Sequence, residues 1–89
     1  MITPKFIKNE IVKQCYEISL HADDERIADG LTISQIEFVL SNCKVLEHYP
    51  EDTRGENCLV MGFTFEATPV HVVCGKNTAG HLFLRFIRI

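Results

Sequence analysis

Histidine and arginine residues on predicted strands could together bind and transform an anion. His71 and Arg85 each lie in a run of alternating apolar residues in the second half of the 89-residue chain. Gly62 lies in a neighbouring run and carries no side chain, so a ligand could approach the backbone closely there. An arginine donates paired hydrogen bonds to phosphate oxygens, and an imidazole transfers protons near neutral pH. These residues predict an anion or phosphate site. The alternative is that His71 and Arg85 are ordinary polar groups on the solvated face of a sheet.

The predicted site depends on which face of each strand points into the core. Bulky residues of neighbouring strands should share the core face, because a one-residue slip turns every side chain over. Phe63 is therefore expected opposite Val72, or an even number of residues from it. The side chains predicted to point inward are those of Leu59, Met61, Phe63, Phe65, Val70, Val72, Cys74, Leu82, Leu84 and Phe86. His71, Phe83, Arg85 and Ile87 should then share the outer face, beside Gly62.

Helical signals fill the first half of the chain. Thr3 and Pro4 are typical of an N-cap and a first helical residue, and they predict a helix over roughly 4–15. An acidic first turn at residues 23–25 and a stop at Gly30 indicate a second helix. Thr32 and Gln35 form a capping box, which begins a third helix that ends near Asn42.

Strand signals follow the helices. Alternating residues predict strands at 44–49, 58–66, 69–75 and 81–88, with a polar loop at 50–57 and a short extended link at 16–20. Helices followed by strands indicate an α+β fold. We expect one domain over residues 1–89, with two to three N-terminal helices packed on one face of a four-stranded antiparallel sheet.

Composition limits the classes of function. A net charge of −3 is unusual for nonspecific nucleic-acid binders, although the last residues carry Lys76, Arg85 and Arg88 without an acid. The chain lacks a signal-peptide pattern and any apolar run of about 18 residues, which predicts a cytoplasmic protein without a membrane span. The four cysteines are typical of buried free thiols, with two disulfides as the alternative. No C-x-x-C or H-x-x-x-H spacing is present, so neither a metal site nor a cofactor is predicted.

Several segments occur in an order that resembles a known bacterial family. They are His21-Ala22, Arg26, Ala28-Asp29-Gly30, Tyr49-Pro50, Arg54-Gly55, Cys58-Leu59-Val60, Gly62 and Pro69-Val70-His71-Val72-Val73. Together they resemble the family numbered 4258 among domains of unknown function, over roughly residues 16–80. The family looks like a branch of the small toxin nucleases with a RelE-like or barnase-like fold. Its members are often paired with a zinc-ribbon, helix-turn-helix antitoxin.

The resemblance implies a metal-independent ribonuclease, or a diverged relative of one, and it carries over to His21, Arg26, Arg54 and His71. Relatives often end in a Thr-Val-Tyr-like strand, whereas this chain ends FLRFIRI. Any catalytic contribution of that tyrosine or threonine would be missing here, or would fall to Arg85 or Arg88.

Metal-free RNA cleavage needs a base, an acid and cations. His71 and His21 are the acid–base candidates, because an imidazole usually titrates near pH 6.5. Arg54 and Arg85 would stabilise the transition state. Tyr49 could stack on a base, and Arg26 and Gly62 could contact the substrate. The alternatives are that His21 caps its helix or pairs with an aspartate, that Arg26 pairs with Asp23 or Asp29, and that Arg54 is a solvated loop charge.

A second class of function is a non-catalytic interaction module. It would pair through its sheet face or through its last strand, whose apolar residues Phe83, Phe86, Ile87 and Ile89 could form an edge that seeks a partner. A homodimer through that edge is a milder form of the same hypothesis. A small-molecule binder is a third alternative, neither favoured nor excluded by the residues.

Overall fold

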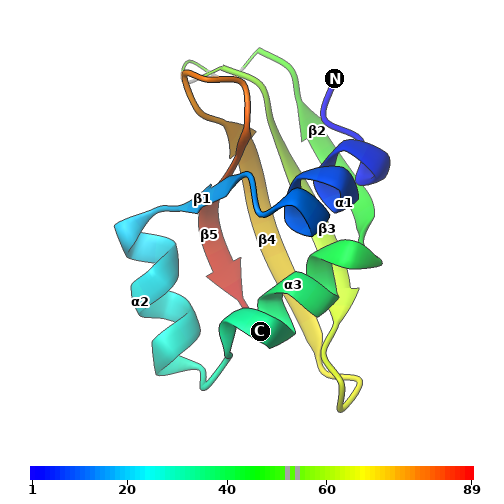
Figure 1. The fold of residues 1–89 in the computed structure, drawn as a ribbon, viewed down its shortest axis with the longest axis vertical. Helices are drawn as coiled ribbons and strands as arrows, with labels where there is room; N and C mark the ends of the chain where they lie inside the picture. Colours follow the sequence, from blue (N-terminus) through cyan, green and yellow to red (C-terminus); the bar gives the residue numbers. More distant parts are fainter. Residues whose placement is uncertain (52, 54) are drawn as a thin grey trace.

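The computed structural model describes residues 1–51, 53 and 55–89, and over these residues the chain forms three helices and one five-stranded sheet (Figure 1). The elements, in chain order, are α1 (Pro4–Lys13), β1 (Tyr16–Ile18), α2 (Leu20–Ala28), α3 (Ile33–Ser41), β2 (Lys44–Tyr49), β3 (Asn57–Phe63), β4 (Pro69–Lys76) and β5 (Leu82–Arg88). The strand order in the sheet is β1-β5-β4-β3-β2. The predicted α+β class is confirmed.

The predicted four-stranded antiparallel sheet is wrong in one strand. The expected link at 16–20 contains β1, which pairs with β5 in parallel, from Tyr16 opposite Leu82 to Ile18 opposite Leu84. Three residues are too few for an alternating pattern to be recognised, and their partners lie far along the chain. The other strand pairs, β2 with β3, β3 with β4 and β4 with β5, are antiparallel as expected.

The helices begin where side chains cap their first turns. The hydroxyl of Thr3 accepts a hydrogen bond from the N–H of Phe6, and the capping box of Thr32 with Gln35 is present. α1 ends at Lys13, two residues before the predicted end, because Gln14 adopts the left-handed conformation with φ 56°. α2 begins after Ser19, whose hydroxyl accepts a hydrogen bond from the N–H of Ala22.

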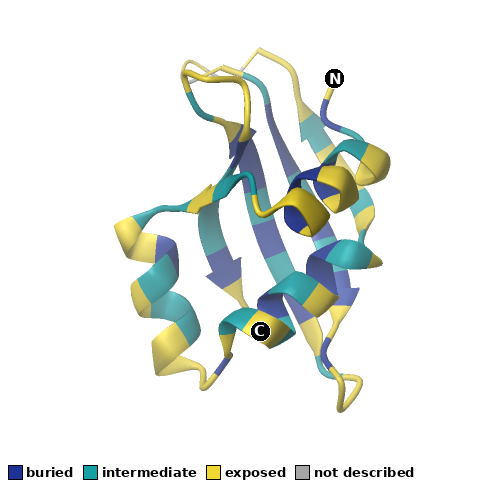
Figure 2. Cartoon of the chain, in the orientation of Figure 1, coloured by how far each residue is buried: buried dark blue, intermediate teal, exposed yellow. Residues whose placement is uncertain are grey.

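Two of the helices cover one face of the sheet. α1 and α3 lie across this face (Figure 1). α2 lies beside β5, along the part of that strand that the short β1 does not pair with. Figure 2 shows buried residues where α1 and α3 meet the sheet and exposed residues on their solvent sides. We call the covered side the core face and the opposite side the outer face.

The core face of β3 carries the opposite set of residues from the predicted one. Cys58, Val60 and Gly62 point inward, Phe63 is half exposed, and Val72 pairs with Val60 instead of with Phe63 or a residue an even number away from it. The reason is the close approach of α3: a Cβ on Gly62 would lie 2.3 Å from the carbonyl oxygen of Val39. Small residues therefore occupy the core face, and the bulky set lies outside.

β5 changes face midway along its length. Leu82 and Leu84 point inward as predicted, but the β4–β5 pairing then shifts by one residue, so that Phe86 lies opposite Val73 and Ile87 opposite Val72. Ile87 is consequently buried, and Phe86 lies on the outer face, the reverse of the expectation. A bulge of this kind turns over every later side chain of the strand.

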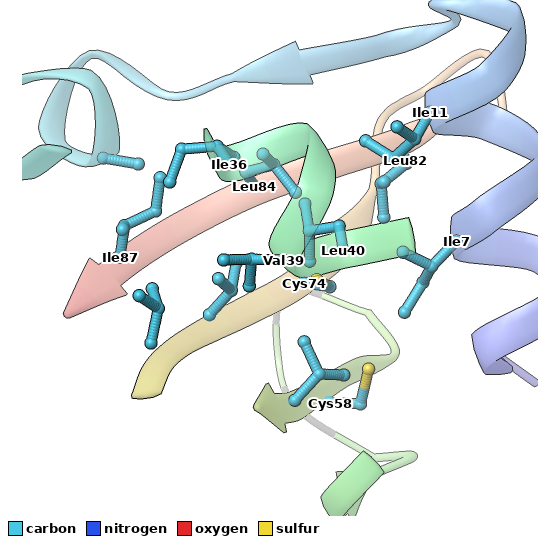
Figure 3. Packing of buried hydrophobic residues seen from close by; sticks show 14 of the residues in the cluster. Ile7, Ile11, Ile36, Val39, Leu40, Cys58, Cys74, Leu82, Leu84 and Ile87 are labelled. Atoms are coloured by element: carbon cyan, nitrogen blue, oxygen red, sulfur yellow. The ribbon is translucent and has the colours of Figure 1, made fainter. Parts of the chain in front are cut away.

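The core lies between α1, α3 and the sheet. Figure 3 shows Ile7 and Ile11 of α1, with Ile36, Val39 and Leu40 of α3, packed against inward residues of the strands. Cys58 and Cys74 are cross-strand partners within this core. Among the described residues, no helix has the length and apolar character needed to cross a membrane.

Candidate functional site

A hollow of about 400 Å³ opens on the outer face of the sheet. Leu59, Val73 and Phe86, from three adjacent strands, supply its apolar lining, and His71 and Arg88 supply its polar groups. Leu59 lies there because the bulky residues of β3 point outward, and Phe86 lies there because the bulge in β5 turns the end of that strand over. Over the described part of the chain, the helices α1 and α3 lie on the other side of the sheet, so the hollow is open to solvent.

His71 and Arg88 are direct cross-strand partners on β4 and β5. The alternation of β4 predicted the outward position of His71. The bulge in β5 brings Arg88 opposite it, where an unshifted register would bring Ile87. Side chains of such partners stand about 5 Å apart at their Cβ atoms, so an imidazole and a guanidinium can reach one ligand. An anion is the ligand that both groups could bind.

His21 approaches the same region from α2. Its ring makes an edge-on contact with Phe86, with 5.1 Å between the ring centroids and 79° between the planes. Phe86 is itself part of the lining of the hollow. Of the two histidines predicted as an acid–base pair, His21 therefore contacts Phe86, and His71 lines the same hollow from the neighbouring strand β4.

Glu25 links His21 to Arg88. Its Oε2 lies 3.5 Å from Nε2 of His21 and 3.2 Å from Nε of Arg88, and its Oε1 accepts the N–H of Ile87 at 2.9 Å. The carboxylate thus ties α2 to the edge of β5 that β1 leaves uncovered. Sequence reasoning assigned Glu25 only to an acidic first turn, although its position four residues after His21 on a helix indicates such a pair.

Arg85 lies away from this hollow, in a second one of about 380 Å³. Its guanidinium crosses Gly75, where a Cβ would lie 2.8 Å from Nε, and Nε donates to Oδ1 of Asn57 at 2.6 Å. The group also lies 4.9 Å from the ring centroid of Phe83. The second hollow is lined by Glu17, Lys76, Asn77, Thr78, Phe83 and Arg85.

The predicted substrate-binding residues are not brought to the first hollow. Gly62 faces the core under α3, so the expectation that it makes room for a ligand on the outer face is wrong. Arg26 donates to Asp23 at 2.7 Å and to the carbonyl of Leu31 at 3.1 Å, the helical ion pair that was its alternative. Gly62 and Arg26 therefore make structural contacts within the protein, whereas the sequence predicted that they contact the substrate.

Tyr49 and Arg54 complete the set of predicted residues. Tyr49 ends β2, and its hydroxyl donates to Glu47; this hydrogen bond is the main reason that the pKa of Tyr49 is raised. Tyr49 pairs with Asn57 on β3, and Asn57 is four residues from Met61, the β3 residue that pairs with His71. Arg54 lies outside the described residues. Tyr49 is therefore remote from His71 along the sheet.

The chemistry available at the first hollow combines three functions. Arg88 can donate two hydrogen bonds to an anionic group, and its charge is partly balanced by Glu25. His71 and His21 can exchange protons with a bound group. Phe86, Leu59 and Val73 form an apolar surface on which a flat ring can rest. Cation, proton carriers and apolar surface all belong to adjacent elements.

Comparisons with known proteins agree with the resemblance noted in the sequence. No curated protein and no solved structure matches the chain. A family profile matches residues 18–87, from the last residue of β1 to the penultimate residue of β5, and the match includes His21, Glu25 and His71. The chain belongs to the family described as domain of unknown function (DUF4258).

Proposed function

We propose that this protein is a metal-independent endoribonuclease of the toxin type, which cleaves RNA at the hollow that contains His71 and Arg88. The observation that carries the proposal is their direct cross-strand pairing in the hollow that Phe86 lines, with His21 in contact with the ring of Phe86. A proton carrier, a phosphate-binding cation and a stacking surface are the groups that metal-free RNA cleavage uses.

The reaction needs one histidine to accept the proton of the 2′-hydroxyl. The 2′-oxygen then attacks the adjacent phosphorus, and the bond from phosphorus to the 5′-oxygen of the next nucleotide breaks. The other histidine donates a proton to that leaving oxygen. The products are a 2′,3′-cyclic phosphate and a 5′-hydroxyl end, and Arg88 stabilises the charge that develops on the phosphate oxygens.

The substrate is single-stranded. A base must leave its stack to rest on Phe86, and single strands present bases in this way. The second hollow offers a matching set for a neighbouring nucleotide, with Phe83 as the ring and Arg85 and Lys76 as the cations. Both hollows lie along β5, so the strand of RNA would follow this element.

A partner of the antitoxin type belongs to the same proposal. A toxin nuclease is harmless only while its active surface is covered, and the outer face is the surface to cover. We propose a zinc-ribbon, helix-turn-helix protein in this role, as the family resemblance implies. Expression of the chain alone is then expected to arrest bacterial growth, and co-expression of the partner to restore it.

The test measures cleavage of fluorescent single-stranded RNA in the presence of EDTA, with circular dichroism confirming that the protein stays folded. Wild type should cut the RNA, and His71→Ala should cut it at least about 100-fold more slowly. His48→Ala is the matched control, because His48 lies on β2 and pairs with Glu56. Absence of cleavage by the folded wild type, or an equal loss in both variants, would overturn the proposal.

A non-catalytic interaction module is the second candidate, and one observation favours it. The outer face is rich in apolar groups, among them Leu59, Val73 and the half-exposed Phe63. Pairing through the C-terminal strand would be restricted to its last residues, because β1 pairs with β5 over Leu82–Leu84. The sheet ends at β1 and β2, so an added strand or a homodimer would use one of these edges. Gel filtration that shows a monomer at all concentrations would count against the homodimer.

A further inference from the structure

Three side chains of metal-ligand type meet at the start of β5. They are Glu10 from α1, Cys15 from the segment after α1, and His81 from the turn before β5. One ligand atom from each residue lies within 4.8 Å of the other two. The spacing of these residues in the sequence does not predict the cluster, because the fold brings together residues from opposite ends of the chain.

The backbone holds each of these residues in place. Gln14 adopts the left-handed conformation at the end of α1, and the N–H of Cys15 donates to the carbonyl of Glu10 at 2.9 Å. On the other side, the N–H of His81 donates to Oδ1 of Asn77 at 2.9 Å. Two local turns therefore hold the backbone at Cys15 and His81, and α1 holds the backbone at Glu10.

Glu10 is a carboxylate in a nearly buried position, with 7% of its surface exposed. Its Oε1 lies 2.8 Å from Nδ1 of His81 and accepts the N–H of Leu82 at 3.2 Å. Both of these contacts involve Oε1, and among the described residues no buried side-chain oxygen lacks a partner, so Oε2 is reached by solvent and by any ion that solvent carries. A buried carboxylate gains most from a nearby positive charge, and a bound cation would supply one.

We propose that Glu10, Cys15 and His81 form a zinc site with a fourth position open to solvent. Zinc combines thiolate, imidazole and carboxylate ligands in tetrahedral sites, whereas magnesium and calcium take oxygen ligands. Ligands of this kind stand roughly 3.3 Å apart around zinc, as bonds of about 2.0 Å require. The contact between His81 and Glu10 needs to open by about half an ångström, and the longest separation in the cluster, up to 4.8 Å, needs to close by about an ångström. The half-exposed ring of His81 can move to do so.

The position of the site gives it a consequence for the fold. The parallel pairing of β1 with β5 begins at Tyr16 opposite Leu82, directly after Cys15 and His81. Zinc would therefore join the two strands at their first residue pair and tie α1 to the sheet. Binding releases the proton of the Cys15 thiol to solvent, so zinc affinity is expected to fall as the pH is lowered. The site lies at the opposite end of β5 from Arg88 and is independent of the proposed nuclease chemistry.

The test uses the full chain, freed of metal with a chelator and then dialysed. Titration with zinc should give a stoichiometry of about one ion per chain and raise the melting temperature by on the order of 10 °C once zinc greatly exceeds its dissociation constant. Cobalt should add a thiolate charge-transfer band to the absorption spectrum. Cys15→Ser should abolish that band, and Cys15→Ser and His81→Gln should each weaken zinc binding at least about 100-fold.

Matched controls are Cys43→Ala and His48→Gln, which remove the same residue types outside the cluster. Both should bind zinc as the wild type does. Failure of the wild type to bind zinc, or equal binding by the wild type and Cys15→Ser, would overturn the proposal. Cys15 is half-buried, and within the described part of the chain its thiol makes only a weak contact with the carbonyl of Lys13, so its serine variant should fold.

Discussion

His71 on β4 lies directly opposite Arg88 on β5, at one end of a hollow on the open face of the sheet. The pair exists because a bulge in β5 reverses the direction of the side chains after Leu84. Without that bulge, Arg88 would point into the core and Phe86 would leave the outer face. One irregular residue in the last strand thus creates the candidate site.

Replacement of Arg88 should weaken RNA binding without loss of stability. Arg88→Gln is expected to lower the affinity for single-stranded RNA about tenfold, and Arg88→Lys less, because lysine keeps the charge but not the paired donors. The side chain is 74% exposed and pairs only with Glu25 among the described residues, so the free energy of unfolding should change by less than about 0.5 kcal/mol. Fluorescence anisotropy measures the affinity, with Lys44→Gln on β2 as the control. Equal weakening by both variants would contradict a defined role for Arg88.

Gly62→Ala should destabilise the protein strongly. The added Cβ would lie 2.3 Å from the carbonyl oxygen of Val39, so α3 or β3 must shift. We expect a loss of about 2–3 kcal/mol in urea unfolding, the upper part of the range for overpacked cores. Val39→Ala should not rescue the variant, because the clash involves the backbone of α3. Rescue by this second substitution would show that the side chain of Val39, and not its carbonyl group, sets the distance.

Gly75→Ala should disturb Arg85 more than the fold. Its Cβ would lie 2.5 Å from Oδ1 of the buried Asn57 and 2.8 Å from Nε of Arg85. Both contacts are with side chains and not with the backbone. The expected loss of stability is therefore smaller than that of Gly62→Ala, on the order of 1 kcal/mol. RNA affinity should fall, because the guanidinium leaves the second hollow. An unchanged affinity would show that Arg85 takes no part in RNA binding.

Glu56 predicts a dependence of stability on acid pH. Burial alone would raise the pKa of Glu56, but hydrogen bonds from His48 and from the N–H of Ile2, with the positive N-terminus, lower it below the ordinary 4.5. A lowered pKa stabilises the folded state above the ordinary value, and this contribution is lost as the pH falls through the lowered one.

The wild type should therefore lose more free energy of unfolding than Glu56→Gln between about pH 6 and about pH 3. Urea unfolding at a series of pH values measures the difference, with the exposed Glu51→Gln as the control. Parallel curves for the wild type and Glu56→Gln would show that these contacts do not act on stability.

The sequence by itself determined the helices, four of the five strands and the family. Thr3 and Thr32 cap their helices through hydrogen bonds to residues three positions on, so these starts could be recognised locally. The alternation of apolar and polar residues located four strands, because this pattern can be read from residues that are adjacent in the sequence. The ordered motifs around His21 and His71 indicated the family whose profile the chain matches.

Only the tertiary structure decided the faces, the fifth strand and the meeting of distant residues. Alternation with a period of two describes either face of a strand equally well, and the approach of α3 to Gly62 selects one of them. The bulge that pairs Arg88 with His71 arises from packing between β4 and β5. Glu10 and His81 meet because β1 pairs with β5 across the length of the chain. Rules that use only neighbouring residues cannot predict such contacts, because the energy of each contact depends on which distant surfaces pack together.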